Sequence, residues 1–464
     1  MKPVRTRWTR WLLVAAVAPL ATPTPPADAA SASPVPTTVS PRSSRDITVL
    51  PDAAGCTVDP ARELFIRDLS VVNDCFRTTW TGVCAKPVLP ATRGAWTFGK
   101  LMEGIAGTTD PAQLSAFTLS WLKHWQVDLT INGDPVPKRP DVQSFVVQPW
   151  LAASGGVQLD MKKAPFRLLA IVARLDLRQN SGYSGGGTTA GEGRFVFNLL
   201  DAQGNTTQFL AILEYGLDAR ACTDVKNWAQ AWHALGSIPF GATYNAALQQ
   251  ITDQFSRLGA SPNKPNRSGL NQARTNDFFL DRPWELREFK LIPINDTLTP
   301  APLSEVTVAQ TPANSRQHTQ HLANYINQET PAILAGQHIV PLSFQNQAFR
   351  GGASTHSLDF NWDGPQPPNC GAINTPEARH IVSRETCNGC HGGETGTVFK
   401  HVEPRQPNQV AALSAFLTGS GPITDICGLT HTFGDIERRR IDLCQLLAKS
   451  CAELDTEPVI QFVH

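Results

Sequence analysis

The stretch Arg194 to Tyr215, RFVFNLLDAQGNTTQFLAILEY, decides the fold class. Two runs of branched and aromatic residues flank the polar segment Asp201 to Asn205, and this pattern predicts a β-hairpin. The preceding run Arg167 to Arg178, RLLAIVARLDLR, predicts a third strand, and Trp284 to Leu291, WELREFKL, alternates like a fourth. We therefore expect antiparallel strands in this part of the chain.

Helical patterns surround these strands. Asp110 and Pro111 read as an N-cap and first helical residue, and apolar residues from Leu114 to Trp125 then recur on one face. Two further helices are indicated by Val225 to Leu235 and by Tyr244 to Leu258. The fold class is thus predicted as α+β, with a mixed α/β domain over residues 56–300 and a mainly helical region over residues 301–464.

The composition is that of a folded protein. The chain has 464 residues, of which 41% are hydrophobic and 17% charged, and such a length favours two domains. Lys plus Arg and Asp plus Glu each number 40, so the overall charge does not indicate nucleic acid as a partner.

The N-terminus predicts export. Basic residues precede the apolar run Trp11 to Leu20, and the small residues Ala27, Ala29 and Ala30 follow it. We interpret residues 1–30 as a signal peptide and the Pro-, Ser- and Thr-rich residues 31–55 as a disordered leader. The apolar run is too short to cross a bilayer, so we expect a secreted or periplasmic protein with no membrane span after signal cleavage.

Export makes disulfides possible. Eight of the ten cysteines lie outside the motif described next, and they could form four pairs whose connectivity the sequence does not determine. A direct pair between Cys444 and Cys451 is disfavoured, because on one helix they stand two turns, roughly 10 Å, apart. Each is expected to attach that helix to another part of the chain.

The segment RETCNGCHGGE, residues 384–394, contains a C-x-x-C-H motif. A random chain with ten cysteines and eleven histidines contains this pattern about 0.005 times, so the match is informative. On a helical turn, Cys387 and Cys390 face one side and can reach the two vinyl groups of a haem, while His391 can bind the iron. Thr375 and Pro376 predict a helix that leads into the motif.

The segment from about residue 375 to 419, which ends in AALSAFLTG, resembles a c-type cytochrome. The resemblance implies covalent haem c on Cys387 and Cys390, His391 as the proximal ligand, and a mainly helical cytochrome c-like region. The remainder, with GAWTFGKLM, APFRLLAIVARLDLR and GEGRFVF, resembles uncharacterised exported bacterial proteins that carry one such motif. That second resemblance supplies no function.

The sixth ligand departs from the common pattern, because no methionine follows Met161. We favour His401 as this ligand, ten residues after His391. His431, His356 and His380, a methionine from the other domain (Met102 or Met161), or an open position are the alternatives.

Two other interpretations of the motif remain. Zinc could be held by Cys387, Cys390, His391 or His401, and Cys427, since tetrahedral sites use such ligands. Cys387 and Cys390 could instead form a disulfide. The expected function is an exported single-haem c-type cytochrome, in electron transfer or as a haem-dependent oxidoreductase, with a large N-terminal recognition domain. Its redox partner protein or small-molecule substrate is not identified. The alternative is an exported, disulfide-stabilised binding protein without redox activity.

Weaker candidates lie elsewhere. The glycines between residues 185 and 193 indicate a loop rather than a phosphate site. His318, His321 and His338 could share a metal, although ordinary surface roles explain them equally. The charged residues near the strands are interpreted either as acid–base groups or as strand-end salt bridges: Asp176, Glu192, Arg194 and Glu214.

Overall fold

The computed structural model describes residues 56–178, 189–219, 221–294, 300–357, 360–366 and 370–455. All of them belong to one compact unit, Pro41–His464. The predicted signal peptide (1–30), the predicted leader (31–55) and the glycines at 185–187 lie outside the described residues. Among the described residues, no helix combines the length and apolar character needed to cross a membrane.

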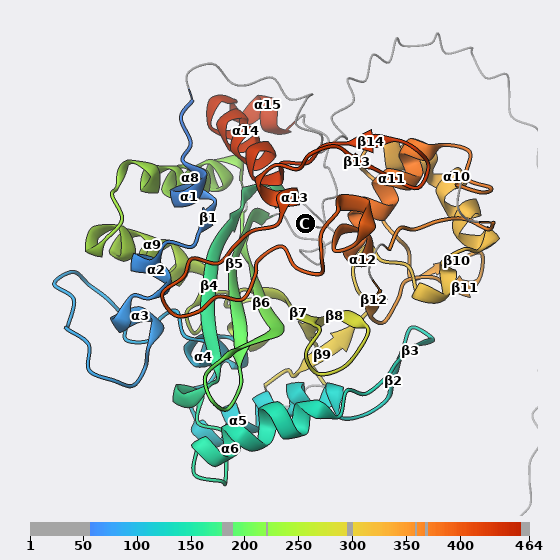
Figure 1. The fold of residues 1–464 in the computed structure, drawn as a ribbon. Coiled ribbons are helices and arrows are strands. Elements are labelled where there is room, and N and C mark those ends of the chain that lie inside the picture. The colour runs from blue at the N-terminus through green and yellow to red at the C-terminus, as the bar shows by residue number, and fades with distance from the viewer. Residues whose placement is uncertain are drawn as a thin grey trace, which may run out of the picture. The chain divides into compact units, whose positions relative to one another are not determined.

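An eight-stranded antiparallel sheet organises the chain (Figure 1). Its order is β1-β4-β5-β6-β7-β8-β12, and β9 also pairs with β8. The strands are β1 (Phe65–Ile66), β4 (Phe166–Arg174), β5 (Thr189–Leu200), β6 (Thr206–Asp218), β7 (Leu270–Asp277), β8 (Trp284–Leu291), β9 (Leu303–Val306) and β12 (Ser354–His356). The four strands expected from sequence are confirmed as β4, β5, β6 and β8. The hairpin is confirmed too, since Leu200 pairs with Thr206 across the Asp201–Asn205 turn.

Both faces of the sheet are buried, which explains why its strands read as continuous apolar runs. Phe195 and Phe197 of β5 point into one core, whereas Val196 between them points into a second core on the opposite face. Strand β6 repeats this division with Leu213 and Leu210. The period of two in side-chain direction therefore separates two cores.

Helices from the first half of the chain cover the first face. They are α4 (Phe98–Ala106), α5 (Pro111–Leu122), α8 (Cys222–Ala234) and α9 (Ala242–Ser256). The predicted N-cap of α5 is confirmed, because the Asp110 carboxylate accepts a hydrogen bond from the amide of Gln113 at 2.8 Å. Its residues Leu114 and Trp121 are buried in the first core.

In the C-terminal part of the chain, Cys390, Phe416 and Phe433 pack in the second core, whereas Leu443 and Leu446 lie in the first. The helices of this part are α10 (Gln320–Leu334), α11 (Pro376–Glu385), α12 (Cys387–Cys390), α13 (Ala415–Thr418), α14 (Asp435–Ala448) and α15 (Cys451–Asp455). This part also supplies β9 and β12 to the central sheet. The α+β class is therefore established, while the domain boundary near residue 300 stays a prediction.

Four disulfides cross-link the described residues: Cys56–Cys444, Cys75–Cys84, Cys222–Cys451 and Cys370–Cys427. The expectation that Cys444 and Cys451 do not pair with each other is confirmed. Each attaches the C-terminal helices to a distant segment, across 388 and 229 residues of sequence respectively. Cys387 and Cys390 belong to none of these four disulfides and are buried.

Candidate functional site

The C-x-x-C-H motif lies on two consecutive short helices. Helix α11 begins at Pro376, directly after Thr375, as the sequence predicts. The chain then turns at Thr386, whose hydroxyl caps α12 by accepting a hydrogen bond from the amide of Gly389 at 3.0 Å. Cys387 and Cys390 therefore project from one rigid turn, and both are completely buried.

The glycine inside the motif has a packing role. A Cβ on Gly389 would stand 2.0 Å from the carbonyl oxygen of Ser383. Only glycine thus allows α12 to approach the end of α11 this closely.

His391 follows α12 and is held in one orientation by the central sheet. Its Nδ1–H donates to the carbonyl oxygen of Phe399 at 2.8 Å. Asn276 of β7 donates to the same carbonyl at 2.8 Å, and its own side-chain oxygen accepts from the indole of Trp284 at 2.8 Å. The Trp284 ring also stacks on the His391 ring, with centroids 5.2 Å apart.

These contacts determine the protonation of His391. A carbonyl oxygen can only accept, so Nδ1 carries the proton and Nε2 carries the lone pair. Burial, and after it the charge of His401, lowers the pKa of His391 well below its ordinary value. The imidazole is therefore neutral at physiological pH, which is the state in which histidine binds metals.

His401 lies beside His391, with ring centroids 4.3 Å apart. Its Nδ1 is 2.9 Å from the hydroxyl of Ser414, and its Nε2 is 3.4 Å from the sulfur of Cys390. Imidazoles on opposite sides of one ion have centroids on the order of 6 Å apart, because each metal–nitrogen bond is ~2 Å. The structure thus brings both predicted histidines together, while ligation by His401 stays a prediction.

The other histidines considered as sixth ligands do not line the pocket. His356, on β12, packs against Trp284 at 4.5 Å between ring centroids, and its charge contributes to the lowered pKa of His391. His380 and His431 stack on each other at 3.4 Å in a separate cluster.

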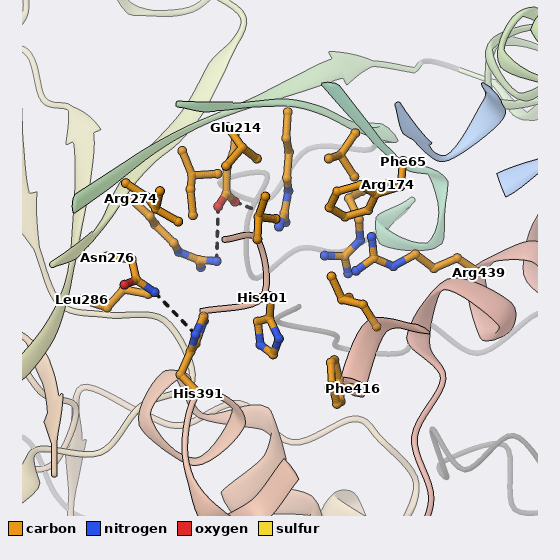
Figure 2. A pocket seen from close by; sticks show the side chains of 17 residues that line it. Phe65, Arg174, Glu214, Arg274, Asn276, Leu286, His391, His401, Phe416 and Arg439 are labelled. Atoms are coloured by element: carbon orange, nitrogen blue, oxygen red, sulfur yellow. Dashed lines mark hydrogen bonds and ion pairs between the residues drawn. The ribbon is translucent and has the colours of Figure 1, made fainter. Parts of the chain in front are cut away.

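A pocket with a cavity volume of about 90 Å³ opens between the motif and the second face of the sheet (Figure 2). His391 and His401 line one side of it, and β4, β5, β6 and β7 line the other. The apolar lining residues are Phe65, Val172, Val196, Leu210, Ile212, Leu286, Val402, Phe416 and Leu417.

Four arginines also line the pocket: Arg174, Arg194, Arg274 and Arg439. Two of them are balanced by carboxylates, since Arg194 pairs with Glu192 and Glu214, and Arg274 pairs with Glu288. These pairs support the salt-bridge interpretation of the charged residues near the strands. Asp176 likewise pairs with Arg174 and with Arg438.

Positive charge is in excess at the end of the pocket where Arg439 lies near Arg174. Burial, and after it the charge of Arg174, lowers the pKa of Arg439 to about 9. Burial also lowers the pKa of Arg174, although Asp176 opposes the shift. An anionic group at this end would therefore be stabilised.

The two thiols border this pocket. Cys390 packs in the second core with Val196, Leu210 and Phe416, which line the pocket. Cys387 packs against Leu286, another lining residue. Burial raises the pKa of the Cys387 thiol to about 11, so it is protonated.

The zinc interpretation loses one expected ligand, because Cys427 is bonded to Cys370. Within the part of the chain that the structure describes, only one group of three or more His, Cys, Asp or Glu donors converges within 4.8 Å, namely His380, Asp425 and His431. His318, His321 and His338 do not form such a group there.

Sequence reasoning missed Arg174, Arg274 and Arg439, and it did not single out Asp425. For Arg174 a signal was available, because it lies in the apolar run of β4, FRLLAIVAR. Arg274 carried no such signal, because β7, LNQARTND, is polar. Comparison of the chain with protein-family models, with curated proteins and with solved structures found no match.

Proposed function

We propose that this chain is an exported single-haem protein resembling c-type cytochromes, which acts in electron transfer or other haem-dependent redox chemistry. Cys387 and Cys390 would hold haem c through thioethers, and His391 would be its proximal ligand. The observation that carries the proposal is the neutral His391, which lines a pocket and whose Nδ1–H is bound to a carbonyl, next to two buried cysteines outside the four disulfides.

The lining of the pocket suits this group chemically. A haem has a flat apolar ring and two carboxylates, and the pocket has apolar walls and an end where Arg174, Arg438 and Arg439 share only two carboxylates, Asp176 and Asp435. Haem iron supplies one-electron chemistry between its ferrous and ferric states, at a potential set by axial ligands and burial.

Each part of the site has a separate task. The hydrogen bond to Phe399 and the stacking of Trp284 orient His391, and such outer contacts fix the tautomer and direction of a ligating histidine. The apolar side chains of β4, β5 and β6 exclude water. His401 is our candidate for the sixth ligand.

Residues 56–300 supply the strands that form the wall of the pocket, and we also attribute recognition of a redox partner or small-molecule substrate to this range. The alternative function, an exported binding protein, would use the same motif for zinc or a disulfide.

The test is a pyridine haemochrome spectrum of protein expressed in a host that attaches haem. The chain should give a haem c spectrum with one haem per protein, and the Cys387→Ala/Cys390→Ala double variant should be colourless. The matched control is Cys75→Ala/Cys84→Ala, which removes two cysteines from a disulfide and should keep the haem. A colourless parent protein with stoichiometric zinc would support the alternative instead.

The sixth ligand needs its own measurement. If His401 is the ligand, the ferric protein shows a low-spin bis-histidine EPR signal, and His401→Ala converts it to high spin. An unchanged spectrum in that variant contradicts ligation by His401.

A further inference from the structure

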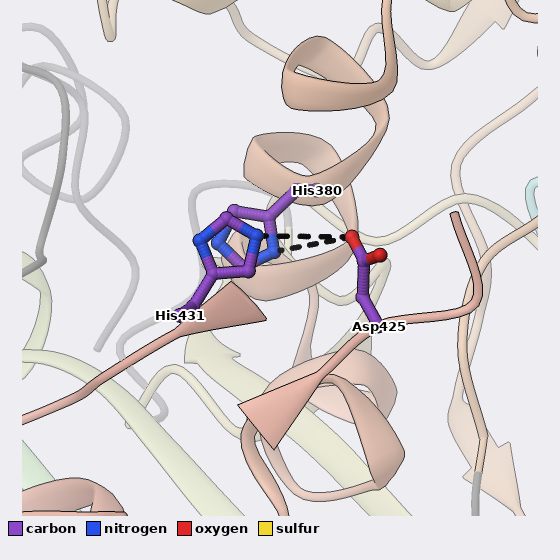
Figure 3. A group of neighbouring side chains, drawn as sticks. All are labelled: His380, Asp425 and His431. Atoms are coloured by element: carbon purple, nitrogen blue, oxygen red, sulfur yellow. Dashed lines mark ion pairs between the residues drawn. The ribbon is translucent and has the colours of Figure 1, made fainter. Parts of the chain in front are cut away.

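A second cluster of metal-binding side chains lies at the junction of α11 with a two-stranded hairpin (Figure 3). His380 comes from α11. Asp425 and His431 come from the hairpin of β13 (Ile423–Thr424) and β14 (Thr430–His431). All three are buried, with exposed fractions of 0%, 7% and 5% respectively.

One donor atom from each residue lies within 4.8 Å of the other two. Nε2 of His431 is 3.8 Å from a carboxylate oxygen of Asp425, which exceeds the 2.7–3.2 Å typical of a direct N–H···O hydrogen bond. Nδ1 of His380 is hydrogen-bonded to Glu394, so Nε2 is the atom that His380 can offer to an ion. Ligands of one tetrahedral zinc ion stand ~3.3 Å apart, because each bond is ~2.0–2.2 Å. Shifts on the order of 1 Å, with a turn of the stacked rings, would bring the three donors to one ion.

The two imidazoles are arranged as neutral rings. They stack at 3.4 Å with planes 4° apart, a geometry in which two positive charges would repel strongly. Burial also lowers the pKa of His380, although Glu394 opposes the shift. Nε2 of His380 is buried and has no hydrogen-bond partner among the described residues. A buried lone pair without a partner is costly unless a ligand takes it.

The surrounding charge favours a cation. Asp425 and Glu394 carry two negative charges, and Arg379 pairs with both of them at 2.5 and 2.6 Å. One negative charge remains when both histidines are neutral. Glu394 also lies 2.5 Å from Nδ1 of His380, the type of contact by which a carboxylate orients a metal-ligating histidine.

We propose that His380, Asp425 and His431 bind one divalent transition-metal ion of the zinc class. Two imidazole nitrogens and one carboxylate oxygen suit zinc, whereas calcium and magnesium prefer oxygen ligands alone. The proposal is independent of whether haem is attached at Cys387 and Cys390.

The ion would join the hairpin to the helix that leads into the C-x-x-C-H motif. The disulfide Cys370–Cys427 ties the same hairpin to the segment just before α11. Because the cluster is buried, its role is structural: it stabilises the position of α11 and therefore of Cys387.

The test uses chelator-treated full-length protein, titrated with Zn²⁺ alone and analysed for bound metal and thermal unfolding. The parent chain should retain one zinc and unfold at a higher temperature with it. His431→Ala should bind at least ~100-fold more weakly and lose the thermal shift. His338→Ala removes another buried histidine and is the matched control; whatever its own stability, it should keep the zinc affinity of the parent chain and the rise in unfolding temperature on adding zinc.

Zinc bound at the C-x-x-C-H motif is distinguished by two further measurements. The Cys387→Ser/Cys390→Ser variant should retain the zinc. X-ray absorption of the parent chain should show only nitrogen and oxygen ligands near 2.0 Å. No retained zinc, equal retention in His431→Ala, or a zinc–sulfur shell near 2.3 Å would overturn the proposal. The absorption measurement needs no variant, so it decides the question even if His431→Ala fails to fold.

Discussion

Replacing Gly389 by alanine tests how the C-x-x-C-H motif is held. The new Cβ would stand 2.0 Å from the carbonyl oxygen of Ser383, whereas real Cβ atoms essentially never approach a neighbour closer than 3.0 Å. The end of α11 and the start of α12 must therefore separate by about 1.0 Å, the difference between these distances.

That separation has a calculable cost. The Ser383 carbonyl accepts hydrogen bonds from the amide and the hydroxyl of Thr386, at 3.1 and 2.6 Å, and the shift weakens both. Overpacking in a buried site costs ~1–3 kcal/mol, and each weakened hydrogen bond adds up to ~1 kcal/mol. Alanine recovers up to ~1 kcal/mol of helix propensity. The free energy of unfolding should therefore fall by about 2–4 kcal/mol.

Urea unfolding measures this loss, with Gly421→Ala as the control. A Cβ on Gly421 meets nothing within 4 Å, so that variant should stay within ~1 kcal/mol of the parent chain. The Gly389→Ala variant should also carry less haem, because the thiols move with α12. Equal unfolding midpoints for the two alanine variants would refute the packing described for the motif.

Three further predictions concern charge and cross-links. Burial lowers the pKa of His338 from 6.5 to about 4. As the pH falls, the unfolded chain therefore binds a proton at this histidine before the folded chain does, and the free energy of unfolding should drop by ~3 kcal/mol between pH 6.5 and 4. In urea titrations over this range, His338→Leu should show a smaller drop. Arg439→Met should leave the free energy of unfolding of the haem-free chain unchanged or raise it by up to ~1 kcal/mol, because burial and Arg174 disfavour the charge of Arg439. A decrease of more than ~2 kcal/mol in urea unfolding would contradict an excess of positive charge at this end of the pocket. Removing the Cys56–Cys444 disulfide should lower the free energy of unfolding by about 2–3 kcal/mol more than removing Cys75–Cys84, because Cys56–Cys444 closes a far longer loop. Equal decreases in unfolding temperature for the two variants would contradict this prediction.

The sequence was sufficient for the long strands and the helices with strong patterns. The hairpin β5–β6 could be predicted because two apolar runs flank a polar turn, and α5 because Asp110 and Pro111 mark its start. The absence of a Cys444–Cys451 pair was also predicted, although the single helix assumed there is two helices: α14 ends at Ala448 and Cys451 begins α15. These features depend on neighbours along the chain.

Features that depend on distant segments could not be predicted. Strand β12 has three residues and joins the sheet only through its pairing with β8. The arginines at the pocket come from β4, β5, β7 and α14, and no local pattern reveals that they meet. The cluster around Asp425 likewise forms only when the β13–β14 hairpin packs near α11.

The site was predicted in part. The motif identified Cys387, Cys390 and His391; His391 lines the pocket, and the two cysteines are buried among residues that line it. The outer contacts of His391 could not be foreseen, because Asn276 and Trp284 lie more than a hundred residues earlier and reach His391 only through the register of β7 and β8.

The most direct test of the central claim is the intact mass of the denatured protein after expression in a host that attaches haem. The account predicts the mass of the signal-cleaved chain plus one haem, retained through acid extraction and absent from the Cys387→Ala/Cys390→Ala variant. A mass equal to the chain alone, or lower by the two hydrogens of a fifth disulfide, would contradict it.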